Sequence, residues 1–297
     1  MGSDEAIDAV LRAFCVPGTD RILTCPPTYG MYAVSAQVND VAIVKVPLLP
    51  APSFQLDVDA ILSTLSTEPH IKVVYLCSPG NPTGSSLAKD DVARILQHPT
   101  WNGIVVVDEA YVDFAPDGSS LAEWVLEWPN LVVMQTLSKA FGMAGIRLGA
   151  AFAAPPVAGL LNNLKAPYNI SSPTAVLAAA AVSGDGLAGM RAHRASLIAQ
   201  RDRLVAELAR IPGVGRRRGG LDSNFLLYEM LNATGEPDNA VALGVYERLA
   251  ETEGVVVRFR GKEHGCLGCL RITVGTEDEV SRFLEALRSA LEEVRKA

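Results

Sequence analysis

The sequence predicts an α/β protein with a mostly parallel sheet sandwiched by helices and a smaller C-terminal α+β domain. Apolar runs of strand length alternate with helical or loop-like segments in the first part of the chain, a pattern typical of parallel strands covered on both faces. Helices mixed with a few strands follow. With 297 residues, 49% of them hydrophobic, the chain is long enough for two domains. We expect a large domain over residues 1–184 and a small domain over residues 185–297.

The individual elements follow from hydrophobic periodicity. From residue 21 onward, strands of the large sheet are expected at residues 41–48, 71–77, 104–107, 131–134 and 147–153, with a helix at 89–97. Alanine-rich helical sequence follows Ser172 and Pro173 and runs to Ser183, and a glycine break separates it from a long amphipathic helix at about 187–210. The small domain is expected to hold strands at 224–228, 255–259 and 270–274, and helices at 239–251 and from 277 onward.

The first helix is predicted to bind an anion at its start. Apolar residues recur at helical spacing over residues 7–14, so an amphipathic helix begins at residues 2–5. Backbone N–H groups and the positive end of the helix dipole favour a phosphate there. Ser3 or Asp4 could simply cap the helix, and the two roles are compatible. The amides of Asp4 and Glu5, rather than their carboxylates, are expected to face the anion.

Composition argues against several classes of function. The chain has 26 Lys and Arg against 33 Asp and Glu, a net charge of −7, and offers no general basic surface for nucleic acid. The short basic run at 216–218 is interpreted as a solvated loop. The start lacks the positive region of a signal peptide, and the longest apolar tract, at 148–161, is interrupted by prolines and too short to span a bilayer. We expect a cytoplasmic protein with neither membrane nor nucleic-acid partner.

The five cysteines are expected to be free thiols, because their number is odd and the chain carries no export signal. Cys266 and Cys269, with His264 nearby, form the one cluster that looks like a metal site. Zinc ribbons and fingers need a second pair of ligands at a set spacing, which this cluster lacks. No metal is therefore predicted.

Three polar side chains follow apolar runs, within a few residues of where each run ends, and carry the chemistry of the prediction. Lys139, Asp108 and Asn81 are these residues, and ligands of open α/β sheets bind at the carboxyl ends of strands. A lysine among small residues, between a hydroxyl and an arginine, is arranged like a Schiff-base lysine beside a phosphate site. An ionised aspartate can keep a pyridinium nitrogen protonated, and the asparagine amide can bond a ring hydroxyl. The alternatives are a surface lysine, a helix cap and a turn residue.

Six motifs give the chain a resemblance to a known family. They are Gly-Ser-Asp-Glu at 2–5, Pro-Thr-Tyr-Gly-Met-Tyr at 27–32, Asn-Pro-Thr-Gly at 81–84, Asp-Glu-Ala-Tyr at 108–111, Thr-Leu-Ser-Lys-Ala-Phe at 136–141 and Cys-Leu-Arg-Ile-Thr-Val-Gly-Thr at 269–276. With them the chain resembles the fold-type I, class-II pyridoxal-phosphate-dependent aminotransferases. The particular residues within these motifs are similar to those of the histidinol-phosphate aminotransferase family, and the similarity extends from the first residues to the last helix.

The resemblance implies pyridoxal 5′-phosphate as the cofactor. By that resemblance Lys139 forms the Schiff base with it, and Asp108 pairs with the ring nitrogen; these two are the expected catalytic residues. Tyr29 stacks on the ring, although a packed loop tyrosine is the alternative. The other cofactor contacts are expected from Asn81 and Tyr111 at the ring oxygen, Ser138 and Arg147 at the phosphate, the helix start at Ser3, Asp4 and Glu5, and Thr136 beside the lysine.

Two strand arginines are predicted to bind the anionic groups of the substrate. A guanidinium pairs with a carboxylate or phosphate through two hydrogen bonds, and Arg271 and Arg258 both lie in predicted strands. The resemblance implies that Arg271 binds the substrate carboxylate or phosphate and that Arg258 adds a second phosphate contact. Arg260 shares the strand face of Arg258 and is a rival for its role. An ordinary surface arginine is the alternative.

The implied reaction is a reversible ping-pong transamination in histidine biosynthesis, carried out by a homodimer. It interconverts histidinol phosphate plus 2-oxoglutarate and imidazole-acetol phosphate plus glutamate. The alternatives are an aromatic or other pyridoxal-phosphate aminotransferase, a decarboxylase, and a non-catalytic fragment that binds the cofactor. Family members carry a leading segment with an arm that reaches the partner subunit, whereas Met1 directly precedes the phosphate motif here. We therefore expect this chain to bind the cofactor and to turn over little until such a segment is added.

Overall fold

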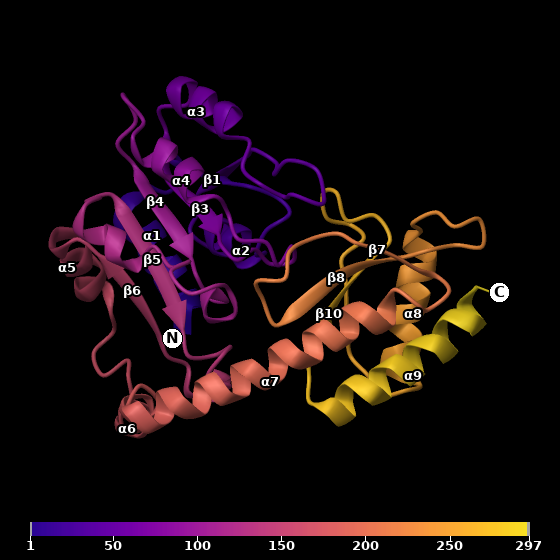
Figure 1. The fold of residues 1–297 in the computed structure, drawn as a ribbon. Coiled ribbons are helices and arrows are strands. Elements are labelled where there is room, and N and C mark those ends of the chain that lie inside the picture. Colours follow the sequence, from indigo (N-terminus) through magenta and orange to yellow (C-terminus); the bar gives the residue numbers. More distant parts are fainter. Residues whose placement is uncertain (1, 296–297) are drawn as a thin grey trace.

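The computed structural model describes residues 2–295, which form two sheets with helices packed around them (Figure 1). The larger sheet has the strand order β2-β1-β3-β4-β5-β6. Neighbouring strands are parallel except for β6, which is antiparallel to β5. The strands are β1 (Arg21–Thr24), β2 (Ala42–Lys45), β3 (Ile71–Cys77), β4 (Ile104–Asp108), β5 (Leu131–Thr136) and β6 (Gly149–Ala153). The mostly parallel sheet predicted from the sequence is thus confirmed.

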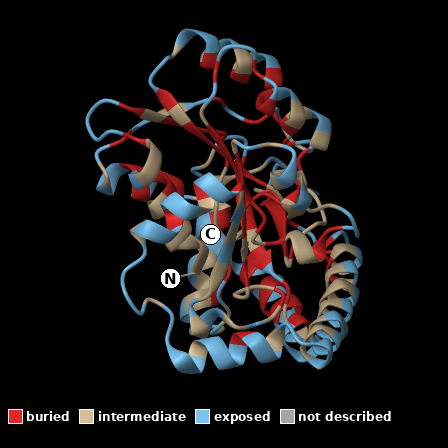
Figure 2. Cartoon of the chain, turned by 90° about the vertical axis from the view of Figure 1, so that its left-hand side faces the viewer, coloured by how far each residue is buried: buried red, intermediate tan, exposed pale blue. Residues whose placement is uncertain are grey.

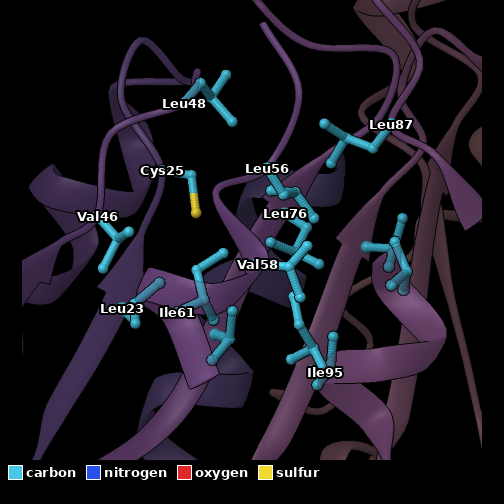
Figure 3. Close-up of a cluster of buried hydrophobic side chains, with 14 of the residues drawn as sticks. Leu23, Cys25, Val46, Leu48, Leu56, Val58, Ile61, Leu76, Leu87 and Ile95 are labelled. Atoms are coloured by element: carbon cyan, nitrogen blue, oxygen red, sulfur yellow. The ribbon is translucent and has the colours of Figure 1, made fainter. Parts of the chain in front are cut away.

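Helices cover both faces of this sheet. Successive residues of a strand point to opposite sides, and the central strands are apolar on both sides, so each face needs a helical layer to bury it. The helices are α1 (Gly2–Phe14), α2 (Met31–Val38), α3 (Val58–Thr67), α4 (Lys89–Leu96) and α5 (Pro155–Leu164), with 3₁₀ turns at η1 (Val112–Phe114), η2 (Ala122–Leu126) and η3 (Ala144–Ile146). On β3, Val73 and Tyr75 face the core shared with α1, α2 and α5, whereas Val74 and Leu76 face the core shared with α3 and α4. Figure 3 shows part of that second core, including Leu76, Ile61 and Ile95.

The second sheet is antiparallel and smaller, in the order β7-β8-β10-β9. Its strands are β7 (Val214–Arg217), β8 (Phe225–Met230), β9 (Arg258–Phe259) and β10 (Cys269–Thr273). The helices of this part are α6 (Ser172–Ala181), α7 (Gly184–Leu208), α8 (Asn239–Glu251) and α9 (Glu277–Val294). Leu204 of α7 joins α8 and α9 in the core of the second sheet, and α7 extends from α6, below the larger sheet, to the second sheet (Figure 1). The domain division after residue 184, at the start of α7, stays a prediction.

The interpretation of residues 216–218 as a solvated loop is wrong. Arg216 and Arg217 lie in β7, which pairs with β8. On β8 the buried carboxylate of Glu229 pairs with Arg216 Nε at 3.3 Å and with Arg218 NH1 at 3.2 Å. A buried carboxylate must be paired to offset its loss of water. The local sequence of residues 216–218 does not indicate that Glu229, on another strand, is their partner. The basic run alone therefore predicted an exposed turn.

Element boundaries differ from the predicted ones where side chains cap or end them. Ser183 accepts the N–H of Gly186, so α7 begins at Gly184, earlier than predicted. The strand expected at 255–259 is limited to its last two residues. Helices α2, α3 and α5 were not predicted, and α3 begins where Asp57 accepts the N–H of Ala60.

Burial follows the layered arrangement, with buried strands inside and partly exposed helices outside (Figure 2). All five cysteines are buried and free. In the part of the chain that the structure describes, no helix is both long and apolar enough to cross a membrane.

Candidate active site

Most of the predicted cofactor residues line a single cavity at the carboxyl edge of the large sheet. Cys77, Asp108 and Thr136 are the last residues of β3, β4 and β5, and parallel strands end at the same edge of a sheet. The predicted residues in the cavity wall are Ser3, Asp4, Tyr29, Asn81, Asp108, Tyr111, Thr136, Ser138, Lys139 and Arg147. The strand-end reasoning therefore located residues that are far apart in the chain but adjacent in space.

Asp108 is a buried acid at the centre of this edge, only 2% exposed. Its Oδ2 accepts a hydrogen bond from the Tyr32 hydroxyl at 2.8 Å, and its Oδ1 accepts one from the Ala110 amide at 3.1 Å. Loss of water on burial raises the pKa of Asp108 to about 6, although both hydrogen bonds act to lower it. A buried carboxylate of this kind favours a positively charged partner.

The raised pKa of Asp108 predicts how the stability of the cofactor-free protein depends on pH. Between the ordinary value of 3.8 and about 6, the folded protein keeps a proton that the unfolded chain has released. The free energy of unfolding should therefore fall as the pH rises through this window. Relative to Asp108→Asn, the wild type should lose about 2 kcal/mol between pH 4 and pH 7. Denaturant titrations of both proteins at the two pH values measure this, and parallel profiles would contradict it.

Lys139 lies in the turn that follows β5, where the strand ends, as predicted. Its Nζ lies 5.3 Å from the centre of the Tyr111 ring. Burial and the positive charges of Arg271 and Arg147 lower the pKa of Lys139, against the opposing effect of Asp4 and Asp108. A lowered pKa increases the share of neutral amine, the form that acts as nucleophile or base.

Backbone contacts place the start of α1 directly against Arg147 and β6. The Gly2 amide donates to the Arg147 carbonyl at 2.9 Å. Gly2 has φ +70°, and a Cβ on it would lie 3.0 Å from an Arg147 guanidinium nitrogen. A Cβ on Gly149 would lie 2.8 Å from the Ser3 amide nitrogen. Only glycine tolerates such a close approach, and the result is a helix start packed beside an arginine, an arrangement suited to an anion.

Hydroxyl groups line the same end of the cavity. Thr136 Oγ1 donates to Ser138 Oγ at 2.9 Å and accepts the Ser138 amide at 3.2 Å. These two bonds fix the turn that leads into Lys139. They also leave Ser138 and Thr136 beside Arg147 in the cavity wall.

The carboxylate of Asp4, and not only its amide, faces the cavity, which differs from the expectation. Asp4 accepts a hydrogen bond from the Tyr29 hydroxyl at 3.0 Å and pairs with the Arg147 guanidinium at 3.4 Å. Attraction to a cation accounts for this orientation. Glu5 is the predicted cofactor residue outside this cavity: its carboxylate accepts from Asn169 Nδ2 at 3.4 Å, and it lines a neighbouring cavity between α1 and α5.

Arg271 reaches the site from the second sheet. It lies on β10, and its guanidinium donates to Asn81 Oδ1 at 2.8 Å. The guanidinium carbon also lies 4.9 Å from the centre of the Phe225 ring of β8. Burial lowers the pKa of Arg271, and its Nε is buried without a hydrogen-bond partner among the described residues. The guanidinium is therefore held at the edge of the cavity with donor capacity to spare.

The two rival arginines lie on the same side of Arg271. Arg258 is directly opposite Arg271 in the antiparallel pair β9–β10, and it is exposed. Arg260 pairs with Glu263 at 2.7 Å and is 27% exposed. The positive charges of both act to lower the pKa of Arg271, so either can add to the positive field at the mouth of the site.

Three contributors to the site were missed by sequence reasoning. Tyr32 supplies a side-chain hydrogen bond to Asp108, Cys77 lines the cavity, and Phe225 packs its ring against Tyr111 at 5.0 Å. Tyr32 ends the Pro-Thr-Tyr-Gly-Met-Tyr motif at 27–32, but its hydroxyl partner is set by the crossing of α2 over β4. No local pattern reveals that crossing.

Comparison with known proteins decides the family. A family model described as aminotransferase class I and II matches residues 1–287. The histidinol-phosphate aminotransferase of Schizosaccharomyces pombe is 53% identical over 296 residues, covering 99% of this chain and 76% of the relative. The chain belongs to the histidinol-phosphate aminotransferases, within the class I and II aminotransferases. The predicted resemblance is confirmed.

Other members of this family agree with the assignment. Histidinol-phosphate aminotransferases of Saccharomyces cerevisiae and Escherichia coli are 47% and 42% identical, covering 98% and 97% of this chain and 74% and 76% of those relatives. The solved histidinol-phosphate aminotransferase of Sinorhizobium meliloti, in complex with pyridoxal-5′-phosphate, has a TM-score of 0.87 at 22% identity and covers 99% of this chain and 76% of its own. At that identity it shows the fold alone, and it confirms the fold-type I prediction.

Proposed function

We propose that this protein is a pyridoxal-phosphate-dependent histidinol-phosphate aminotransferase. It interconverts histidinol phosphate plus 2-oxoglutarate and imidazole-acetol phosphate plus glutamate, in histidine biosynthesis. The observation that carries the proposal is the joint presence of Lys139 and Asp108 in one cavity, in a chain 53% identical to a histidinol-phosphate aminotransferase over nearly its whole length.

The residues of the cavity fit pyridoxal phosphate by charge and chemistry. Its phosphate suits the end formed by Arg147, Ser138 and the start of α1, where backbone N–H groups and a guanidinium converge. The ring nitrogen suits Asp108, a buried acid whose charged form needs a cationic partner. Gly149, where a Cβ would lie 2.8 Å from the Ser3 amide, supports a closely packed phosphate site. When bound, this cofactor acts as an electron sink for the amino group being transferred.

Lys139 and Asp108 do the acid–base work in the proposed reaction. The Nζ of Lys139 would hold the cofactor, and it is the group placed to move a proton at the reacting carbon of the substrate. Its lowered pKa makes the neutral amine available for that step. The carboxylate of Asp108 would hold a proton on the ring nitrogen, and that positive charge would favour negative charge developing on the substrate.

The remaining cavity residues orient and shield the reactants. Asn81 has an amide N–H to donate to the ring oxygen while its Oδ1 accepts from Arg271, and the Tyr111 hydroxyl donates to the same oxygen. Tyr29, anchored through its hydroxyl to Asp4, stacks on the ring. Thr136 fixes the turn next to Lys139. Asn81, Tyr111 and Tyr29 would orient the cofactor for proton transfer, and Thr136 acts by fixing the turn that carries Lys139.

Arg271 and Arg258 bind the substrate anions in this proposal. Losing a charge-assisted contact typically costs about 1.5 to 3 kcal/mol, so Arg271→Ala and Arg258→Ala should each lower kcat/KM roughly ten- to hundredfold. Arg258→Ala should impair histidinol phosphate more than glutamate. Steady-state kinetics with both amino donors measure this. An equal loss of kcat/KM for both donors in Arg258→Ala would show that Arg258 does not contact the phosphate. Arg260→Ala tests whether Arg260 makes that contact instead.

Amine and keto-acid profiling tests the substrate assignment. The proposal expects the highest kcat/KM for histidinol phosphate with 2-oxoglutarate. A preference for aromatic amino acids would indicate a related aminotransferase, and release of carbon dioxide would indicate a decarboxylase.

We further propose that the protein acts as a homodimer. Apolar side chains of α6 are exposed, including Val176 at 69% and Leu177 at 49%, and the helix at the lower left of Figure 1 presents a largely exposed face (Figure 2). Exposed apolar patches mark association surfaces. Sedimentation of the purified chain should give twice the monomer mass, and a monomer at micromolar concentration would contradict the proposal. A cytoplasmic location stays a prediction.

A further inference from the structure

We propose that Tyr32 is a positioning residue whose hydroxyl holds Asp108 in its charged form and in one orientation. The inference rests on the proposed function, because it concerns the acid assigned to the ring nitrogen of the cofactor. It adds a residue that does not line the cavity and would touch neither cofactor nor substrate. Tyr32 lies behind the cavity, in the core between α1, α2 and the large sheet.

The ring of Tyr32 is fixed on two sides by other tyrosines. It stacks on Tyr75 of β3, with ring centres 4.8 Å apart and an angle of 15° between the planes. Tyr29 meets it edge-on at 5.7 Å and 87°. Tyr32 and Tyr75 are both 0% exposed, so neither ring has room to turn away. Packing alone therefore directs the Tyr32 hydroxyl.

The fixed hydroxyl points at the acid. It donates to Asp108 Oδ2 at 2.8 Å, and the Ala110 amide occupies Oδ1. Burial raises the pKa of Tyr32 well above its usual value, so the hydroxyl keeps its proton and remains a donor at every working pH. A hydrogen bond from a neutral donor favours the charged form of a carboxylate, and here it opposes the effect of burial.

Other groups around Asp108 act on its charge from every side. They are Asp4 of α1, Lys139 in the turn after β5, Cys77 and Tyr75 of β3, and the hydroxyls of Tyr29 and Tyr111. The negative charge of Asp4 raises the pKa of Asp108 and the positive charge of Lys139 lowers it. Among the described side chains, the Tyr32 hydroxyl alone donates a hydrogen bond to this carboxylate.

Tyr75 provides a matched control. Its hydroxyl is also buried, donating to the Ile7 carbonyl at 2.9 Å, and its ring is the other half of the stack. Tyr75→Phe therefore removes one buried hydroxyl from the same tyrosine pair without touching Asp108. Tyr32→Phe removes the hydroxyl that does touch it.

The first measurement uses the protein without cofactor. A carbon-13 label on the aspartates follows the ionisation of Asp108 by NMR, with Asp108→Asn to assign its signal. Losing a hydrogen bond to a charged group should raise the pKa of Asp108 by roughly one to two pH units in Tyr32→Phe and leave it unchanged in Tyr75→Phe. An unchanged pKa in Tyr32→Phe, or an equal rise in both variants, overturns the inference whatever the protein catalyses.

The second measurement compares binding of pyridoxal phosphate with binding of its analogue in which carbon replaces the ring nitrogen. The wild type should prefer pyridoxal phosphate at pH 7. Tyr32→Phe should lose up to about tenfold of that preference at pH 7, where more of its Asp108 is neutral, and recover it at pH 9. A loss that persists equally at pH 9 would indicate a purely structural role and overturn the inference. Absence of any preference in the wild type would instead reject the role of Asp108 in the proposed function.

A double substitution covers the case in which Tyr32→Phe is poorly folded. In the Asp108→Asn background, Tyr32→Phe should no longer change the preference between the two cofactors, because no charge is left to hold. Circular dichroism compares folding of all variants. An effect of equal size in both backgrounds would show that Tyr32 does not act through Asp108.

Discussion

Replacing Lys139 with alanine is expected to lower the turnover number for transamination by about 10⁴-fold or more. General acid–base catalysis by a positioned group contributes roughly 10²–10⁴-fold, and the same amine is assigned the covalent link to the cofactor. The side chain lies in a turn at the cavity wall, so its removal should leave the fold intact. Single-turnover kinetics with glutamate or histidinol phosphate measure the loss as a rate per bound cofactor.

Lys262 offers the matched control for this experiment. It is an exposed lysine in the segment between β9 and β10, outside the cavity wall. Lys262→Ala should retain the wild-type rate and the wild-type cofactor content. A Lys139→Ala protein that keeps its rate within tenfold of the wild type would remove Lys139 from the mechanism.

Replacing Asp108 with asparagine is expected to slow the proton-transfer step by roughly 10²–10³-fold, the usual effect of removing one preorganised electrostatic contact. Asparagine keeps the shape of the side chain and can still accept the Tyr32 hydroxyl, but it cannot balance a positive ring nitrogen. Cofactor should still bind through the phosphate end and Lys139. Stopped-flow absorbance of the bound cofactor after mixing with amine measures the step.

Asp113 is the matched control for Asp108. It is another acid whose pKa is raised by burial, but it lies in η1 and does not line the cavity. Asp113→Asn should leave the rate of proton transfer near that of the wild type. Equal slowing in the two variants would point to a general effect of buried charge and not to the ring nitrogen.

Much of the site could be predicted because strand periodicity fixes where strands end. The β-branched runs before Asp108 and Lys139 are the cores of β4 and β5, and parallel strands bring their carboxyl ends to one edge. The turn-rich segment after β3 placed Asn81 beside them for the same reason. The local pattern predicts each strand, and the end of each strand predicts the position at the sheet edge. These residues were therefore predictable without any knowledge of side-chain contacts.

Contacts between elements that are distant in the chain were not predictable in this way. Glu229 gains its arginine partners only when β7 pairs with β8, which is why the basic run before it was misinterpreted. Tyr32 reaches Asp108 only because α2 packs over the sheet. The roles of Arg258 and Arg260 depend equally on the geometry of β9, and both arginines lie near Arg271.

Borohydride reduction followed by peptide mapping tests the central claim most directly. The purified chain is incubated with pyridoxal phosphate, reduced, digested and analysed by mass spectrometry. We expect a single major modified peptide that contains Lys139, and loss of that modification in Lys139→Ala. Modification chiefly at Lys165 or Lys262, or equal labelling of many lysines, would contradict it.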